Sequence, residues 1–596
     1  MAPDVTRRAA LAGTAASLAS TGCLGRVRNI AGRDGPAPVT LRIRTMPADS
    51  DPHGIRIARH LAENLKRAGI EPRLNTTSET ELYRQVLVNQ DFDLYVGQFP
   101  EPDPFDPDLL YPFCHSSFTT EPGWQNPFGL TDLTIDEQLD RQRHVTGSER
   151  IDVVNDLQVE IARQKPFVTV AFPDELTAVR DARFEGWRAT QPAAETGLVA
   201  LEHAAPAEST AEDDGDEQPV VLRLLSTDAG FTKNRNPIAV EYRRNGTYTG
   251  LLYDPLVRGF DGETFPCLAR DVTWSDDAVR LSLRDVSWHD GEPFTAEDVA
   301  FTYAFLADTS MGDAESPIPT SRFRGQVSLV ERATAVAADE VEIEFGDVSR
   351  GVAERALRVP ILPKHVWSER TDPASIAGVE VNQQTTEALV WANPAPVGTG
   401  PLAFVEAEPE SNVALERNDE HPIATGAPGV PDSLAGKPSF DRLEIEIVPS
   451  DVAAVQQVGD GYADATASSL GPNAVPRVGR ESDVRLVSER SAAFYHVGFN
   501  ARDEPLSNPH FRQTVARLVD KAWLAAETFD GYAIPAASPL AISDRWAADE
   551  LAWNGTDPVT PFLGENGTAD PAAAKKAFRD IGYRYSDDGK LLGDVQ

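Results

Sequence analysis

The sequence has 596 residues, 41% of them hydrophobic, which is enough for two to four lobes with cores of their own. Its 93 acidic residues outnumber its 55 lysines and arginines and give a net charge of −38. Nucleic acid is therefore excluded as a partner, because a phosphate backbone needs a basic surface. Acids occur along the whole chain, and salt screens their repulsion, so we interpret the composition as halophilic.

The first 23 residues differ from the rest of the chain. The paired arginines Arg7 and Arg8 precede a small-residue apolar run that is too short for a conventional transmembrane helix. This pattern resembles a twin-arginine export signal, and Gly22–Cys23 resembles the lipidation site of lipoproteins, although Ser20 departs from the usual Leu. We expect lipidation at Cys23, a tether over 24–36, and anchoring on the outer face of the cytoplasmic membrane.

A β-α-β unit is predicted next. The alternating stretch VTLRIRT from Val39 is typical of a half-buried strand. Ile57, Leu61 and Leu65 then recur every four residues, which predicts an amphipathic helix ending at Gly69. The segments IEPRLNT and DFDLYVGQF read as further strands. An acidic Pro-rich loop, a helix over IDVVNDLQVEIARQK and a short buried strand, PFVTVAF, follow.

Residues 191–219 are small, acidic and aperiodic, which predicts a solvated linker. Many short strands and loops follow, with a clear strand in RLEIEIVPS at 442–450. From Asn508, the segment NPHFRQTVARLVDKAWLAAETF reads as a helix with Asn508 as N-cap. Near the end, AFRDIGYRYSDDGKLLGDVQ predicts a helix, a turn and the start of a strand.

No catalytic constellation is visible. The three cysteines have neither metal-ligand nor disulfide spacing, and we expect Cys114 and Cys267 to be partly buried apolar residues. The ten histidines form no ligand pair, so a metal site could arise only by long-range assembly, and His289 and His365 are interpreted as structural. We therefore expect no enzyme activity and no cofactor.

The segment VSWHDGEPFTAEDVAFTYAFL at 286–306 carries the most specific signal. Asp290–Gly291 predicts a turn, and Thr295 with Asp298 predicts a capping box. The segment resembles the signature of the family 5 extracellular solute-binding proteins, the peptide- and nickel-binding receptors of ABC importers. Segments resembling other parts of the family follow in the same order, among them VPILPKHVW, PVGTGPLAFVEAEPESNVALERN and FYHVGFNARDEPLSNPHFRQTVARLVDKAW.

This resemblance implies an α/β fold of two lobes, periplasmic-binding-protein-like (type II) with an inserted subdomain, and a ligand cleft between the lobes. The segments that end the chain in the family here precede the linker, so we expect a circular permutation, the alternatives being a gene-model error or a partial duplication. The implied lobe I comprises 164–190 and 220–450, with the subdomain near 255–385. The implied lobe II comprises 37–163 and 451–596, with the strand from Val39 beside Lys590–Val595.

The function implied is a lipid-anchored binding protein that delivers a small solute, most often a di- or oligopeptide, to ABC permease subunits. Relatives take nickel chelates, haem or sugars, and a ligand sensor or an enzyme such as a peptidase are the alternatives. On the family pattern, Phe99 is the aromatic at the end of a ligand-contacting strand. Glu101 or Asp103 pairs with the ligand's α-ammonium, and Tyr495 lines the same cleft. The alternative is that these acids are solvated loop charges.

Overall fold

The computed structural model describes residues 37–100, 105–121, 123, 125–188, 195–204, 218–239, 248–376, 379–380 and 385–595. Arg7, Arg8, Cys23, Glu101 and Asp103 lie outside these residues. Among the described helices, none is both long and apolar enough to cross a bilayer.

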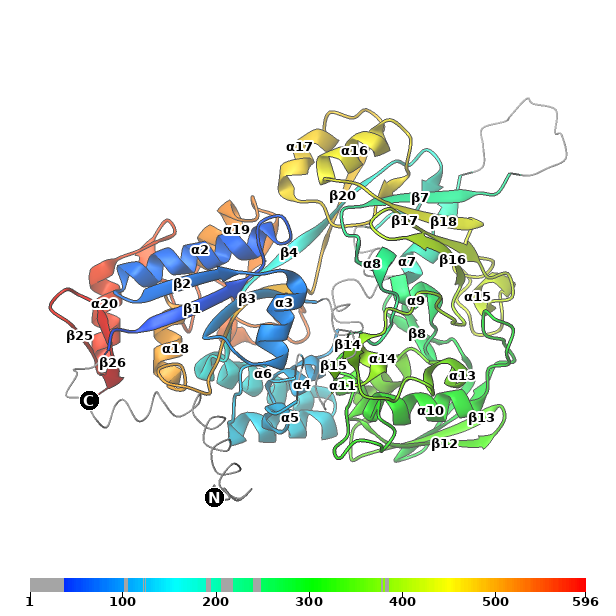
Figure 1. The fold of residues 1–596 in the computed structure, drawn as a ribbon, viewed down its shortest axis with the longest axis horizontal. Coiled ribbons are helices and arrows are strands. Elements are labelled where there is room, and N and C mark those ends of the chain that lie inside the picture. Colours follow the sequence, from blue (N-terminus) through cyan, green and yellow to red (C-terminus); the bar gives the residue numbers. More distant parts are fainter. Residues whose placement is uncertain are drawn as a thin grey trace, which may run out of the picture.

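A single twelve-stranded sheet runs through the molecule (Figure 1). Ten of its strands follow one another in space in the order β16-β17-β18-β7-β19-β4-β21-β3-β1-β2, and β20 and β22 also pair with β4. Their bounds are β1 Thr40–Thr45, β2 Glu71–Thr76, β3 Leu94–Phe99, β4 Phe167–Val179, β7 Val221–Ser226, β16 Leu402–Glu408, β17 Asn412–Arg417, β18 Arg442–Ile447, β19 Ala465–Thr466, β20 Arg485–Arg490, β21 Phe494–Phe499 and β22 Ala533–Pro535.

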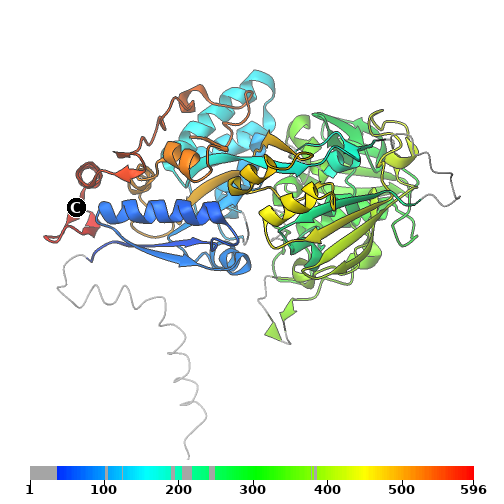
Figure 2. The same ribbon diagram turned by 90° about the horizontal axis from the view of Figure 1, so that it is seen from above.

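The hydrophobic cores divide the molecule into two lobes, which lie side by side in both views (Figure 1, Figure 2). The core of lobe I is built from residues between Val179 and Val487. The two cores of lobe II combine residues 39–172 with residues 494–591, so segments from the two ends of the described chain share one lobe. The pairing of β3 with β21 in antiparallel register joins these two segments directly.

In lobe II, helices cover both faces of the parallel strands β2, β1 and β3. The helix α2 packs its buried Ile57, Leu61 and Leu65 on this sheet, as their spacing predicts. It ends at Arg67, two residues before the expected Gly69, which follows the C-cap Ala68 with φ +86°. The lobe II helices are α2 Pro52–Arg67, α3 Glu79–Tyr83, α4 Leu110–Cys114, α5 Leu133–His144, α6 Gly147–Gln164, α18 Pro509–Ala516, α19 Lys521–Glu527 and α20 Pro571–Asp580. Its paired short strands are β23 Gly564–Glu565 with β24 Thr568–Ala569, and β25 Tyr583–Tyr585 with β26 Leu591–Val595.

Lobe I adds a four-stranded antiparallel sheet against which the longest helix of this lobe, α10, packs. The sheet consists of β10 Ala269–Trp274, β11 Ala278–Leu283, β13 Glu340–Phe345 and β12 Val330–Ala337. The helices of this lobe are α7 Glu195–Val199, α8 Gly230–Lys233, α9 Thr249–Leu252, α10 Ala296–Ala307, α11 Arg324–Val327, α12 Arg350–Ala353, α13 Lys364–Trp367, α14 Glu387–Val390, α15 Pro422–Thr425, α16 Asp451–Gly459 and α17 Val475–Val478. Its two-stranded sheets are β5 Phe184–Glu185 with β6 Glu202–His203, β8 Val257–Phe260 with β9 Glu263–Pro266, and β14 Ser375–Ile376 with β15 Val379–Glu380.

The expected capping box and turn are confirmed. The Thr295 N–H donates to the Asp298 carboxylate at 2.9 Å, and α10 begins at the next residue. Asp298 also accepts the backbone N–H of Lys364 at 3.0 Å, which ties the start of α10 to α13. Gly291 has φ +89° and donates its N–H to the Trp288 carbonyl, as a turn residue does.

Two local expectations are wrong. The linker prediction fails for residues 195–203, because Leu198, Val199 and Leu201 are buried in the core of lobe I and β6 pairs with β5. The helix from Asn508 is two helices, α18 and α19. Asn508 caps α18 as expected, but Asp520 accepts the backbone N–H of Trp523 at 3.1 Å and starts α19.

The lobe boundaries also lie elsewhere than the resemblance implied. The first half of β4 pairs with β21 and β22 in lobe II, and its second half, from Asp174, pairs with β20. The chain thus changes lobe within β4, near Pro173, rather than at residue 164. Likewise β19 pairs with β7, and α16 packs beside it, so residues 451–490 belong with lobe I.

Candidate functional site

The expected ligand-contacting aromatics lie on two neighbouring strands but on opposite faces of the sheet. Phe99 is 6% exposed and stacks on its register partner Phe494, with 5.1 Å between ring centroids. Tyr495, the next residue along β21, therefore points to the other face, where it is 3% exposed. Its hydroxyl donates to the Asp51 carboxylate at 2.9 Å, and that carboxylate also caps α2. The structure does not bring Phe99 and Tyr495 together.

A small apolar pocket lies at the carboxyl edge of β1 and β3. Since these strands are parallel, their ends meet at one edge of the sheet, where α/β lobes bind ligands. A single π-helical turn, Arg84–Val88, forms one wall; such turns occur frequently at functional sites. The space inside is about that of one water molecule. The pocket is lined by Met46, Leu82, Tyr83, Val86, Leu87, Tyr95, Gly97 and Gln98.

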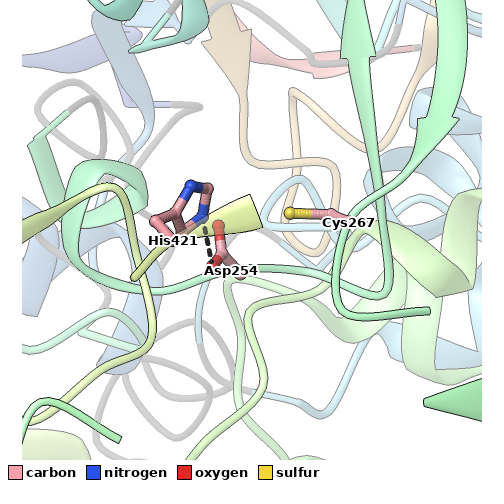
Figure 3. Close-up of side chains that lie close together, drawn as sticks. All are labelled: Asp254, Cys267 and His421. Atoms are coloured by element: carbon pink, nitrogen blue, oxygen red, sulfur yellow. Dashed lines mark hydrogen bonds and ion pairs between the residues drawn. The ribbon is translucent and has the colours of Figure 1, made fainter. Parts of the chain in front are cut away.

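A buried cluster in lobe I has the residue types of a metal site (Figure 3). Asp254 lies between α9 and β8, Cys267 directly follows β9, and His421 caps α15. Their ligand atoms lie within 4.8 Å of one another. The three positions are separated by up to 167 residues, so no local spacing could have revealed the cluster.

The hydrogen bonds of this cluster argue against a metal ion. His421 Nδ1 accepts the backbone N–H of Ile423 at 3.1 Å, so the imidazole proton lies on Nε2, which donates to Asp254 at 3.0 Å. The other Asp254 oxygen accepts from Arg258 at 2.7 Å. A cation would have to displace that proton and sit beside a guanidinium. We therefore assign the cluster to the structural core of lobe I.

The pKa values within the cluster agree with this assignment. Burial alone would raise the pKa of Asp254, but His421 and Arg258 outweigh it and hold that pKa well below its usual range. Burial raises the pKa of Cys267, which keeps the thiol protonated within this hydrogen-bonded cluster. Burial likewise raises the pKa of Cys114. Both cysteines are fully buried rather than partly so.

Lobe II contains two buried lysines around one aspartate, a cluster that the sequence did not indicate. Lys521 donates to Asp557 at 2.5 Å and to the Ala536 carbonyl at 2.8 Å. Lys165 lies close enough to both residues to feel their charges. Burial is the main cause that lowers the pKa of Lys165 to about 7. The charge of Asp557 acts to raise this pKa, and the charge of the neighbouring Lys521 acts to lower it. When both lysines are protonated, their two positive charges face the single negative charge of Asp557.

The histidines interpreted as structural do make structural contacts. The ring of His289 contacts the Gly400 carbonyl at 3.0 Å, and His365 contacts Asp290 at 2.9 Å. The buried His496 is bonded to the Tyr95 hydroxyl at 2.6 Å, and burial lowers its pKa to about 3. These histidines therefore serve packing and hydrogen bonding within each lobe.

A family comparison decides the classification. The model of the bacterial extracellular solute-binding proteins, family 5 (middle part), matches residues 263–595, more than half of the chain. The chain belongs to this family. The resemblance inferred from residues 286–306 is confirmed.

Curated family 5 relatives match over part of their length. A Brucella ovis protein named as an ABC transporter peptide-binding protein is 24% identical over 360 residues, 56% of this chain and 60% of the relative. The oligopeptide-binding protein AppA of Bacillus subtilis is 22% identical over 249 residues, 42% of this chain and 40% of AppA. The chain thus spans about 60% of the length of the former.

Solved family 5 structures resemble the chain at low identity. AppA of Bacillus subtilis, in complex with a nonapeptide, has a TM-score of 0.44 at 18% identity and covers 64% of this chain and 68% of its own. NikZ of Campylobacter jejuni, in complex with Ni(L-His), has a TM-score of 0.42 at 19% identity and covers 63% of this chain and 66% of its own.

Proposed function

We propose that this protein is the extracellular substrate-binding component of an ABC importer and that it captures a di- or oligopeptide between its lobes. Membership of family 5 is the observation that carries the proposal. Two lobes joined at β4 and between β20 and β21 suit this role, because capture by hinge closure needs only a higher affinity for the closed arrangement. Relatives named as peptide-binding proteins favour a peptide over a metal chelate.

The peptide's α-ammonium is proposed to pair with Glu101 or, in its place, Asp103. An ammonium enclosed between lobes needs a charged partner, because an unpaired buried charge costs several kcal/mol. Pro100 and Pro102 flank Glu101 and would limit the backbone entropy lost on binding. The preceding strand β3 ends at Phe99, whose ring stacks on Phe494. The residue from which the chain continues towards Glu101 is therefore held in place by packing. Tyr495 remains a proposed lining residue.

Calorimetry with tetra-alanine and its N-acetylated form, at high salt, tests this function. Tetra-alanine should bind the wild type, and acetylation should weaken that binding strongly. Glu101→Gln should cost roughly 2–5 kcal/mol and remove most of the effect of acetylation. The exposed Glu137→Gln is the matched control and should bind as wild type does. If neither peptide binds, while a nickel chelate or a sugar does, the peptide assignment is wrong.

The protein is also proposed to be a lipoprotein, exported through the Arg7–Arg8 signal and acylated at Cys23. One acyl chain gives only marginal membrane binding, whereas two give stable attachment. A Cys23→Ser variant should therefore appear in the soluble fraction of disrupted cells, with the wild type in the membrane fraction. Equal partitioning of both proteins would contradict the anchor.

We further propose that the order of segments is circularly permuted relative to the family. Residues 37–172 complete a lobe whose other half comes from residues 494–591. The Val39 N–H donates to the Leu591 carbonyl at 2.8 Å, and the Gly593 N–H donates to the Ala37 carbonyl at 3.0 Å. Residues 593 and 37 face each other in an antiparallel pair, so a short turn could connect them without moving either strand, as a permutation requires.

A further inference from the structure

A network of ion pairs connects the two lobes on the side away from the strands that join them. In Figure 1 the shared strand β4 and its partner β20 run through the upper middle of the molecule, whereas α4, α5 and α11 meet in the lower middle. The two 3₁₀ turns Pro107–Leu109 and Glu354–Arg358 supply the central charges. The first turn belongs to the core of lobe II and the second to the core of lobe I.

Asp108 is the centre of this network. It is fully buried and accepts from Arg143 Nε at 2.5 Å and from Gln142 at 2.7 Å, both on α5 of its own lobe. Its second oxygen accepts from Arg143 at 3.0 Å and from Arg355 of the other lobe. One carboxylate is thus shared between an arginine of each lobe.

Further contacts extend the interface around this centre. Arg324 on α11 of lobe I forms a bidentate pair with Glu121 of lobe II, at 2.8 and 2.9 Å. The Ser349 N–H donates to the Arg143 carbonyl at 2.6 Å, and the Gln125 amide donates to the Ser321 carbonyl at 2.5 Å. These contacts are hydrogen bonds and ion pairs, so they can separate into water without exposing a large apolar surface.

The charges explain why this contact favours closure. Arg355 enters a site that already contains Asp106 and Asp108, and it remains only 7% exposed. Burial would raise the pKa of Asp106, but Arg355 and Arg150 outweigh it and lower that pKa. When the lobes separate, Arg143 can still neutralise Asp108, whereas Arg355 loses its partner across the interface. The pair thus acts only between the lobes and only when they are together.

We propose that Arg355–Asp108, with Arg324–Glu121, is a latch that stabilises the closed arrangement of the lobes independently of ligand. Arg355 and Arg324 are positioning residues: they raise ligand affinity by increasing the population of the closed state. The affinity effect rests on the proposed function, whereas the effect on lobe separation does not. The partly exposed Arg324–Glu121 pair should weaken with salt more than the buried Arg355–Asp108 pair.

The test measures lobe separation without ligand, by electron–electron spin resonance between labels at Glu137→Cys and Ala338→Cys. These positions are exposed and lie in different lobes. The native Cys114 and Cys267 are buried and will not react, and Cys23 is replaced by Ser in every variant so that it takes up no label. Arg355→Met and Arg324→Gln should shift the distance distribution to longer separations, and the double variant more than either. Arg355→Met leaves the Arg143–Asp108 pair intact, so lobe II should remain folded.

Two variants within single lobes are the matched controls. Arg150→Met removes an equally buried arginine that pairs with Asp106 inside lobe II. Arg223→Gln breaks a pair of comparable exposure to Glu444 inside lobe I. Neither should change the distances. Unchanged distances in Arg355→Met, or equal opening in Arg150→Met, would overturn the latch whatever the ligand proves to be.

A second measurement connects the latch to binding. If tetra-alanine binds the wild type, Arg355→Met should weaken it by about fivefold or more, with circular dichroism unchanged. Opening of the lobes without loss of affinity would overturn the role in binding. If tetra-alanine does not bind the wild type, the distances alone decide the latch, so its failure and that of the proposed function are distinguishable.

Discussion

At the scale of single residues, the buried Lys165 makes the stability of the fold depend on pH. It ends α6 with φ +51°, is 2% exposed, and lies beside Lys521 and Asp557. Its pKa in the folded chain, about 7, is below that of an unfolded lysine. Between these values the unfolded chain binds more protons, so stability rises with pH from about 7 upwards, and the penalty is complete below that pH.

We expect Lys165→Met to be more stable than wild type at pH 6, by about 1–4 kcal/mol, because a buried charge is replaced by an apolar chain of similar size. The difference should shrink as pH rises through 7 towards 10. Urea unfolding at pH 6 and pH 9, in constant high salt, measures it. The exposed Lys66→Met is the control and should show no such pH dependence. A variant less stable than wild type at pH 6 would refute this account.

Asp254→Asn should be strongly destabilising, by about 3–5 kcal/mol, because it leaves Arg258 buried without a full counter-charge. Cys267→Ser should have a smaller effect, since no metal bond is lost. Thermal unfolding of both variants, with and without EDTA or added Zn²⁺, measures these effects. A fall in the wild-type melting temperature on adding EDTA would contradict the structural assignment of the Asp254–Cys267–His421 cluster.

At the scale of elements, the start of α10 combines a cap with a tertiary contact. Asp298→Ala removes the bonds to the N–H groups of Thr295 and Lys364, and should cost about 1–3 kcal/mol. The neighbouring Glu297→Ala removes only an exposed pair with Lys364 and should cost less than about 1 kcal/mol. Urea unfolding compares the two. Equal losses would show that the capping box adds nothing beyond the surface charge.

Elements with a strong local signal could be predicted from the sequence. The period of four through Ile57, Leu61 and Leu65 predicted the buried face of α2, and the Thr295–Asp298 pattern predicted where α10 begins. Prediction failed where local composition and tertiary packing disagree. Residues 191–219 are acidic on average, yet the short apolar run at Leu198–Leu201 is enough to place residues 195–203 in a core.

The candidate sites could be predicted far less well than the elements. The Asp254–Cys267–His421 cluster and the Asp108–Arg355 pair each join residues more than a hundred positions apart, so only the fold brings them together. The break between α18 and α19 is similar in kind. The apolar pattern of the sequence continues through this break. Asp520 acts as an N-cap only because its side chain accepts a hydrogen bond from the Trp523 N–H, three residues further on.

At the scale of the whole molecule, the proposed permutation can be tested by moving the ends of the chain. We expect a chain opened between residues 204 and 218, with residue 595 joined to residue 37 through a short glycine-serine linker, to fold. Its circular dichroism and melting temperature should match those of the wild type within a few degrees, because no described strand pairing is cut. Opening the chain at Pro173 in β4 instead is the control and should prevent folding.

The sharing of β4 has a further consequence, for how the protein unfolds. Neither lobe contains the whole of the central sheet, because β21 and β22 pair with the first half of β4 and β20 pairs with its second half. If one lobe unfolds and its half of β4 leaves the sheet, the other lobe therefore loses the continuation of a strand with which its own strands pair. We expect heat to unfold both lobes in one cooperative step, with calorimetric and van't Hoff enthalpies in agreement. Two resolved calorimetric peaks would instead show that each lobe is its own unit of unfolding.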